Sequence, residues 1–200
     1  MLRHALTLFV ISLQFAASYT AAQPPPMLGA RAWILVDATS GARLAAYEPT
    51  ARLEPASLTK LMTAYVVFTA LSENRIALTD TVTVSPAAFA TPGKFGARMY
   101  LEPGRAVNVD QLLRGMLTVS ASDAAVALAE HSAGSVDAFV DRMNAEVRRL
   151  GMANTHFANP TGQSDAQNYS SAEDMAILAR RLLTDFPQHA PLFAQREFAY

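Results

Sequence analysis

The hydrophobic pattern of the chain begins as strands and then changes to helices. Two short apolar runs, "AWILVD" (32–37) and "RLAAY" (43–47), flank the turn-rich "ATSGA", a pattern that predicts a β-hairpin. Residues 58–76 follow with helical periodicity and few polar positions, so this helix should be buried on most sides. "TVTVS" (81–85) then alternates as a strand does.

Helical periodicity dominates the second half of the chain, over residues 108–119, 123–134 and 136–151. Gly151 is placed to cap the last of these helices at its carboxyl end. Ser170 and Glu173 have capping-box spacing and should start another helix. We expect a short helix at 191–195 and the beginning of a strand at 196–200. Strands followed by a helical block predict an α+β architecture with a helical insertion.

The first 22 residues have the pattern of a secretory signal peptide. A short basic start precedes the apolar "ALTLFVISLQFAA", and small residues lie before a cut after Ala22. An uncleaved membrane anchor is the alternative interpretation. Residues 23–31 form a Pro-rich leader, and 32–200 form the expected domain, whose mostly helical region runs from about 86 to 185.

Composition excludes several functions. A net charge of −1 with 16% charged residues provides no basic field for nucleic acid. The chain has no cysteine, which excludes disulfides, thiolate metal sites and cysteine catalysis. A hydrophobic content of 51% is typical of a globular protein. The chain uses arginine fourteen times but lysine only at Lys60 and Lys94, so Lys60 serves more than a need for positive charge.

Ser57 and Lys60 lie one helical turn apart in "PASLTKLMTAYVV", so their side chains share one face. A serine hydroxyl is a weak nucleophile until a base removes its proton. Lysine acts as a base only as the free amine, which burial and the positive end of a helix both favour. Arginine stays protonated and cannot replace it. The alternative is an N-cap serine beside a lysine whose amine reaches water.

Two further serines, Ser120 and Ser122, lie in the break between two predicted helices. They either cap these helices or place a second hydroxyl opposite Lys60 to relay a proton. The histidines have no ligand spacing, so no metal site is expected. The chain also lacks the G-x-S-x-G and H-E-x-x-H motifs of hydrolases and zinc proteases.

Four ordered segments together resemble one family, the low-molecular-weight penicillin-binding proteins that act as serine-type D-alanyl-D-alanine carboxypeptidases (peptidase family S11). The resemblance runs in register from about residue 32 to 200. It implies the penicillin-binding-protein and serine β-lactamase-like transpeptidase fold, an antiparallel sheet with a helical subdomain, and a sheet that is incomplete in this chain. The four segments are "EPASLTKLMTAY", "LLRGMLTVSASDAAVALAEHSAGS", "FVDRMNAEVRRLGMANTHFANPTG" and "YSSAEDMAILARRLL".

The resemblance also implies roles for the four polar residues. Ser57 would be the acylated nucleophile, Lys60 its general base and Ser120 a proton relay. Ser122 would contact substrate where the family pattern S-x-N has asparagine. The reaction would remove the terminal D-alanine from a peptidoglycan pentapeptide ending in D-Ala-D-Ala, without a cofactor, and β-lactams would acylate Ser57. The protein would be exported to the periplasm, with membrane attachment only through a longer carboxyl terminus.

The third motif of the family, K-T-G, does not occur in these 200 residues, since Lys94 is followed by Phe95. The resemblance therefore implies a chain truncated before that motif, with little activity of its own. A non-catalytic penicillin- or peptidoglycan-binding remnant is one alternative. A serine β-lactamase is another, although residues 159–169 lack the glutamate that class A enzymes use for deacylation.

Overall fold

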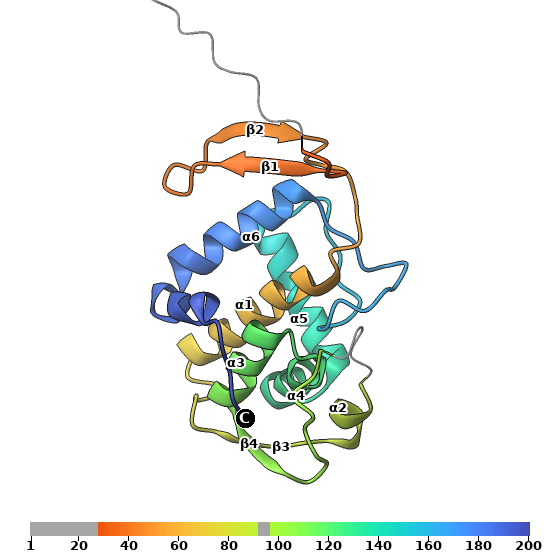
Figure 1. Ribbon diagram of the computed structural model, residues 1–200, viewed down its shortest axis with the longest axis vertical. Coiled ribbons are helices and arrows are strands. Elements are labelled where there is room, and N and C mark those ends of the chain that lie inside the picture. The colour runs from red at the N-terminus through yellow and green to blue at the C-terminus, as the bar shows by residue number, and fades with distance from the viewer. Residues whose placement is uncertain (1–27, 92–96) are drawn as a thin grey trace, which may run out of the picture.

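The computed structural model describes residues 28–91 and 97–200 (Figure 1). The expected signal peptide, most of the leader and Lys94 lie outside these residues. A two-stranded hairpin lies at one end of the molecule, a group of helices fills the middle, and a second small sheet lies at the other end (Figure 1). This arrangement confirms the expected α+β architecture with incomplete sheets.

The hairpin predicted from the first apolar runs is confirmed. Strand β1 (Trp33–Val36) pairs antiparallel with β2 (Arg43–Tyr47), with one irregularity in register near the turn. One face of the hairpin lies over helix α6 (Ala172–Asp185), as Figure 1 shows. The Arg180 side chain ties the two together, because its Nη2 donates to the Thr39 carbonyl in the hairpin turn at 2.9 Å.

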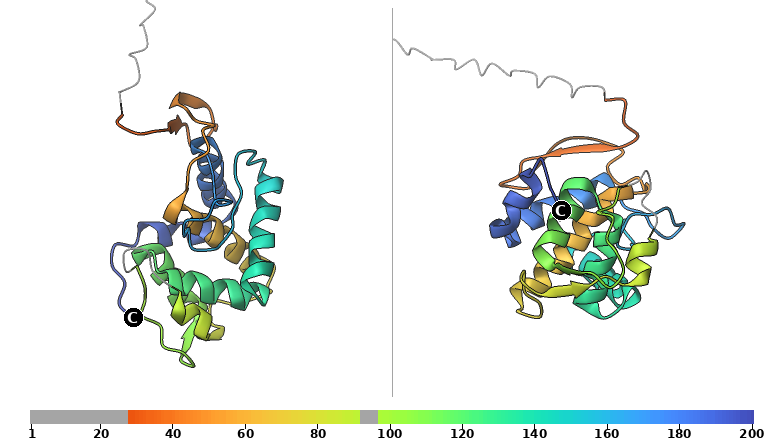
Figure 2. Two further views of the ribbon diagram at one scale, coloured as in Figure 1. Left: turned by 90° about the vertical axis from the view of Figure 1, so that its right-hand side faces the viewer. Right: turned by 60° about the horizontal axis from the view of Figure 1, so that its bottom comes forward.

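Helix α1 (Thr59–Ser72) lies at the centre of the helical block. Ten of its 14 residues are buried, as the continuous apolar pattern predicts. Around it pack α3 (Val109–Val119), α4 (Ser122–Ala133), α5 (Val136–Leu150) and α6 (Figure 2). The largest fully buried side chains include Tyr65, Phe68, Leu112, Leu128, Phe139 and Phe157. This core fixes the amino-terminal end of α1, where the candidate catalytic residues lie.

The predicted helix ends are confirmed in one case and wrong in another. Gly151 ends α5 in the left-handed conformation, with φ +73°. Helix α6 begins one residue later than expected, because Ser171 is its N-cap and accepts from the Asp174 amide at 3.2 Å. Ser170 is held extended instead, since its amide donates to the Leu53 carbonyl at 2.9 Å.

The shortest elements escaped sequence analysis. Strand β3 (Thr81–Thr83) was expected, but its antiparallel partner β4 (Ala106–Asn108) and helix α2 (Pro86–Ala90) were not, because so few residues show no periodicity. A 3₁₀ segment, η3 (Pro187–Ala194), occupies the position of the expected short helix. The strand expected at 196–200 is wrong, since these residues have no strand structure and pair with no described strand.

Candidate active site

Ser57 lies in a single 3₁₀ turn, η1 (Ala56–Leu58), immediately before α1. Its side chain makes no capping hydrogen bond at the start of the helix, so the interpretation as an N-cap serine is wrong. Ser120 Oγ donates to Ser57 Oγ instead, over 3.1 Å. The turn therefore presents a partly solvated serine hydroxyl to a second serine hydroxyl from another helix.

Lys60 is buried, with 4% of its surface exposed, although it lies only one residue inside α1. Its Nζ donates to the Thr161 carbonyl at 2.7 Å rather than reaching water, so the interpretation as a surface lysine is wrong. Burial lowers the pKa of Lys60 to about 8, because the ammonium loses its hydration. Roughly one molecule in ten then carries the free amine at pH 7.

The two serines of the break between α3 and α4 have different environments. Ser120 ends α3 with φ +58°, a left-handed backbone conformation that residues other than glycine rarely adopt. Ser122 is the first residue of α4 and is 4% exposed, and its amide donates to the Ala97 carbonyl at 3.0 Å. The sharp break turns Ser120 toward Ser57. Strain of this kind persists where the surrounding structure imposes it, often at functional sites.

Two hollows meet at Ser57 and Lys60, which line both. The smaller, about 110 Å³, also has Ala97, Ser122, Thr161 and Gly162 in its walls. The larger, about 410 Å³, includes Ser120 and is otherwise mostly apolar, with Leu58, Leu61, Met116, Leu117 and Phe193. The structure therefore brings together all four predicted site residues around Ser57, between a small hollow with several polar side chains in its walls and a larger one lined mostly by apolar side chains.

Sequence analysis missed the part played by Thr161. The residue contributes a backbone carbonyl to Lys60 across 101 positions of sequence, and a backbone group leaves no side-chain signature. A signal existed in the segment itself, because "FANPTG" belongs to one of the four segments that resemble the family.

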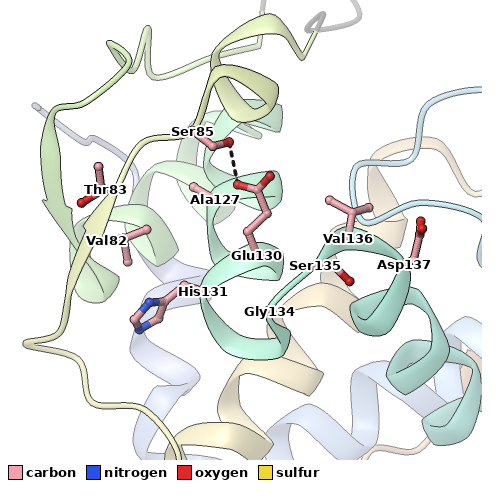
Figure 3. Close-up of a pocket in the computed structure, with 10 residues that line it drawn as sticks. All are labelled: Val82, Thr83, Ser85, Ala127, Glu130, His131, Gly134, Ser135, Val136 and Asp137. Carbon is pink, nitrogen blue, oxygen red and sulfur yellow. Dashed lines mark hydrogen bonds between the residues drawn. The ribbon is translucent and has the colours of Figure 1, made fainter.

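A third hollow of about 570 Å³ lies beside β3 and the junction of α4 with α5 (Figure 3). Its lining shares no residue with the two hollows at Ser57. Ser85 Oγ donates to Glu130 at 2.7 Å there, and His131 Nε2 lies 3.3 Å from an Asp80 carboxylate oxygen. These polar groups are paired within the fold. Residues 28–91 and 97–200 contain no group of three side chains suited to hold a metal ion.

Comparison with known proteins identifies the family. The family model described as D-alanyl-D-alanine carboxypeptidase, peptidase S11, matches residues 18–200. D-alanyl-D-alanine carboxypeptidase DacA of Haemophilus influenzae is 40% identical over 199 residues, which cover 98% of this chain and 49% of that protein. DacA of Escherichia coli is 42% identical over 178 residues, covering 88% of this chain and 44% of that protein. The chain thus spans about half the length of these relatives.

Solved structures agree with the sequence comparison. Penicillin-binding protein 5 from Haemophilus influenzae superimposes with a TM-score of 0.87 at 41% identity, covering 90% of this chain and 52% of that one. Penicillin-binding protein 6B from Escherichia coli superimposes with a TM-score of 0.83 at 36% identity, covering 88% and 56%. The expected penicillin-binding-protein fold is confirmed, and the chain belongs to the D-alanyl-D-alanine carboxypeptidase family, peptidase S11.

Proposed function

We propose that this protein is a serine D-alanyl-D-alanine carboxypeptidase that shortens peptidoglycan pentapeptides, with Ser57 as its nucleophile. One observation carries the proposal: Ser57 Oγ is hydrogen-bonded to Ser120 Oγ beside a buried Lys60 whose pKa burial lowers to about 8. A nucleophile, a relay and a basic amine therefore converge at the mouth of a hollow, as acyl transfer requires.

The proposed reaction proceeds through a covalent ester. Ser57 Oγ attacks the carbonyl carbon of the penultimate D-alanine, and its proton passes to the free amine of Lys60. Ser120 relays that proton to the nitrogen of the departing D-alanine as the peptide bond breaks. Water then attacks the ester, releases the shortened peptide and returns the proton to Ser57. The Ser57 backbone N–H supplies one hydrogen bond to the oxyanion.

The Thr161 carbonyl supports the role of Lys60 as a base. A neutral amine has N–H bonds to donate and one lone pair to accept a proton. When one N–H donates to the Thr161 carbonyl, as it does at 2.7 Å, the lone pair remains free and its direction is restricted. Lysine in this position can therefore be held in place without losing its basicity.

β-Lactams are proposed as covalent inhibitors at the same serine. A structure of penicillin-binding protein D2 from Listeria monocytogenes in its ampicillin-bound form is among the matches, with a TM-score of 0.73 at 26% identity. We also propose that residues 1–22 direct the protein to the periplasm, where its substrate would lie. In the part of the chain that the structure describes, no helix is long and apolar enough to cross a bilayer.

The test is acylation by a fluorescent penicillin, followed by peptide mapping of the adduct and measurement of D-alanine release. The adduct should lie on Ser57 and vanish in Ser57→Ala. Ser40→Ala, which alters an exposed serine of the hairpin turn, is the control and should label normally. An adduct on another residue, or equal labelling of Ser57→Ala, would contradict the assignment.

A second candidate function is that of a non-catalytic penicillin- or peptidoglycan-binding protein. The observation that favours it is Ser122 in the position of the family asparagine. The same experiment separates the two. A stable Ser57 adduct with no D-alanine release indicates binding alone, and rapid hydrolysis of the penicillin itself indicates a β-lactamase.

A further inference from the structure

Gly162 lies unusually close to the peptide bond that precedes Ser57. A Cβ atom added to Gly162 would lie 1.8 Å from the Ala56 carbonyl oxygen, 2.4 Å from the Ala56 carbonyl carbon and 3.1 Å from the Ser57 nitrogen. The two shortest of these distances are far below a van der Waals contact. All three atoms belong to the backbone, which cannot move aside as the end of a flexible side chain can. Only glycine therefore fits at residue 162 while the Ala56–Ser57 peptide keeps its place.

The peptide that Gly162 touches is under backbone constraint. Ala56 has φ +46°, in the left-handed region that an alanine rarely adopts. Its carbonyl also accepts from the Thr59 amide at the start of α1. The peptide plane is thus held by the hydrogen bond from Thr59 and by the close approach of Gly162. That plane sets the direction of the Ser57 N–H, the proposed oxyanion donor.

The loop that carries Gly162 is folded around one amide side chain. Asn159 Oδ1 accepts from the amides of Thr161 at 3.2 Å, Gly162 at 2.8 Å and Gln163 at 3.1 Å, and from Thr161 Oγ1 at 2.9 Å. Asn159 Nδ2 donates to the Gln163 carbonyl at 3.1 Å. A local network of this density holds a short loop in one conformation.

The same loop binds α1 at two successive turns. Thr63 Oγ1 donates to the Pro160 carbonyl at 2.7 Å, and Lys60 Nζ donates to the Thr161 carbonyl at 2.7 Å. Thr63 is fully buried, so the first bond anchors the loop to the core of the molecule. The second bond brings the Thr161 carbonyl of the anchored loop into contact with the amine of Lys60.

We propose that the loop 159–162 is a positioning element of the active site, in which Gly162 orients the Ala56–Ser57 peptide and Asn159 holds the Thr161 carbonyl on Lys60. These residues act through Ser57 and Lys60 and do not touch the reacting atoms. The inference rests on the proposed function, because Ser57 must be the nucleophile for its orientation to affect the rate. It adds Gly162 and Asn159 to the residues on which acylation depends.

The matched variants are Gly162→Ala and Gly134→Ala. Both glycines have similar positive φ angles, +81° and +86°, which alanine rarely adopts, so the substitution is strained at both positions. Nothing lies within 4 Å of a Cβ at Gly134, whereas the Ala56 carbonyl blocks one at Gly162. Any difference between the variants therefore reports the contact with Ala56. Asn159→Ala loosens the same loop without a steric clash and provides an independent variant.

The first measurement is penicillin acylation in the protein as its gene encodes it, resolved into the noncovalent Kd and the acylation rate constant. We expect the rate constant to fall roughly 10- to 100-fold in Gly162→Ala and in Asn159→Ala, because displacement of a reacting group by about 1 Å costs up to this much. The Kd of Gly162→Ala should remain near that of Gly134→Ala. The urea midpoint of Gly162→Ala should be the lower of the two, because its Cβ meets the Ala56 carbonyl, so Asn159→Ala, which introduces no clash, separates loss of positioning from loss of stability.

The second measurement does not depend on activity. These 200 residues contain only two lysines, so 13C labelling of lysine Cε lets Lys60 be titrated directly, and Lys60→Met identifies its signal. Moving the loop away admits water, so the pKa of Lys60 should rise from about 8 toward 10.5 in Gly162→Ala and stay unchanged in Gly134→Ala. Equal rates and equal Lys60 titrations in the two variants overturn the inference. A wild type that never acylates, combined with the expected Lys60 titrations, contradicts the proposed function and leaves the positioning loop supported.

Discussion

Ser120 Oγ lies 3.1 Å from Ser57 Oγ, although 63 positions separate the two serines in sequence. Ser57 stands just before α1 and Ser120 at the carboxyl end of α3, so packing between these helices creates the contact. The left-handed backbone at Ser120, φ +58°, is what aims its hydroxyl at Ser57. A hydrogen bond between two hydroxyls is the path along which the proposed proton relay would run.

Ser120→Ala removes this path without changing the backbone strain, because alanine and serine both carry a Cβ. We expect the rate of penicillin acylation at Ser57 to fall by roughly 10² or more, the range for loss of a general acid–base group. Stopped-flow labelling measures it. Ser120→Gly relieves the strain and also lacks the hydroxyl, so it should be as slow as Ser120→Ala. Recovery of the rate in Ser120→Gly would mean that backbone geometry, rather than the hydroxyl, limits the reaction.

Lys60→Arg should abolish acylation at neutral pH, since a guanidinium keeps the positive charge but cannot accept a proton. In the wild type, the acylation rate should rise with pH and level off above a midpoint near 8, because the free amine is the active form and burial places the pKa of Lys60 at about 8. The rate of penicillin labelling between pH 6 and 10 tests both points. Near-normal acylation by Lys60→Arg would show that Lys60 acts only as a charge.

The long helices and the hairpin were predictable because their patterns are local. The apolar repeat of α1 and the turn between β1 and β2 are visible in short windows of sequence. The expected strand at 196–200 failed because a strand depends on a neighbour, and none of the described strands lies beside it. The N-cap of α6 is Ser171 rather than the expected Ser170 for a similar reason, since pairing with the distant Leu53 holds Ser170 extended.

The candidate site was also predictable only where its features are local in sequence. Spacing placed Ser57 and Lys60 on one helix face, and the choice of lysine in an arginine-rich chain suggested a basic amine. Burial of Lys60 and the contact with Ser120 agree with that interpretation but depend on tertiary packing. The Thr161 carbonyl could not be found from residue types, because every residue has a carbonyl and only the fold selects this one.

Lys60→Met should change how stability depends on pH. Below pH 8 both the folded and the unfolded protein hold the Lys60 ammonium, and its burial destabilises the fold by about 3 kcal/mol at most, from a pKa lowered from 10.5 to about 8. Between pH 8 and 10.5 only the unfolded state stays protonated, so the wild type gains stability relative to Lys60→Met as pH rises. Urea unfolding of both proteins from pH 7 to 10 measures this difference. A difference independent of pH would contradict the lowered pKa.

Ser122→Asn restores the residue that the family pattern has in the second motif. Ser122 lines the smaller hollow together with Lys60, and its hydroxyl group is on a shorter side chain and has fewer hydrogen-bonding groups than an asparagine amide. If the shorter side chain costs one substrate hydrogen bond, Ser122→Asn should raise kcat/KM for a D-Ala-D-Ala peptide from a few-fold to about tenfold. Ser122→Gln carries the same amide on a side chain one methylene longer than asparagine, so it is the control for where the amide is placed. A large fall with asparagine would show that the site is built around serine.

The outer face of the hairpin leads to a prediction about association. Leu35, Leu44 and Tyr47 are 54%, 63% and 55% exposed on a sheet of two strands. An isolated hairpin is marginal in water, and clustered apolar groups at a free strand edge favour pairing with another chain. Residues 23–200 expressed alone should therefore self-associate and release D-alanine slowly. Light scattering and D-alanine release, compared with a version extended through a K-T-G strand, measure both properties.

Paired glutamate variants test the origin of that association. Leu35→Glu with Leu44→Glu should suppress the self-association of residues 23–200, because two charges oppose pairing at the hairpin. Leu28→Glu with Leu183→Glu adds the same charge at leucines that are each 51% exposed outside the hairpin, and it should leave association unchanged. Equal suppression by both pairs would show that net charge alone controls solubility. A monomeric wild-type 23–200 with a cooperative melt and turnover equal to the extended version would mean that two strands suffice to complete the sheet and the site.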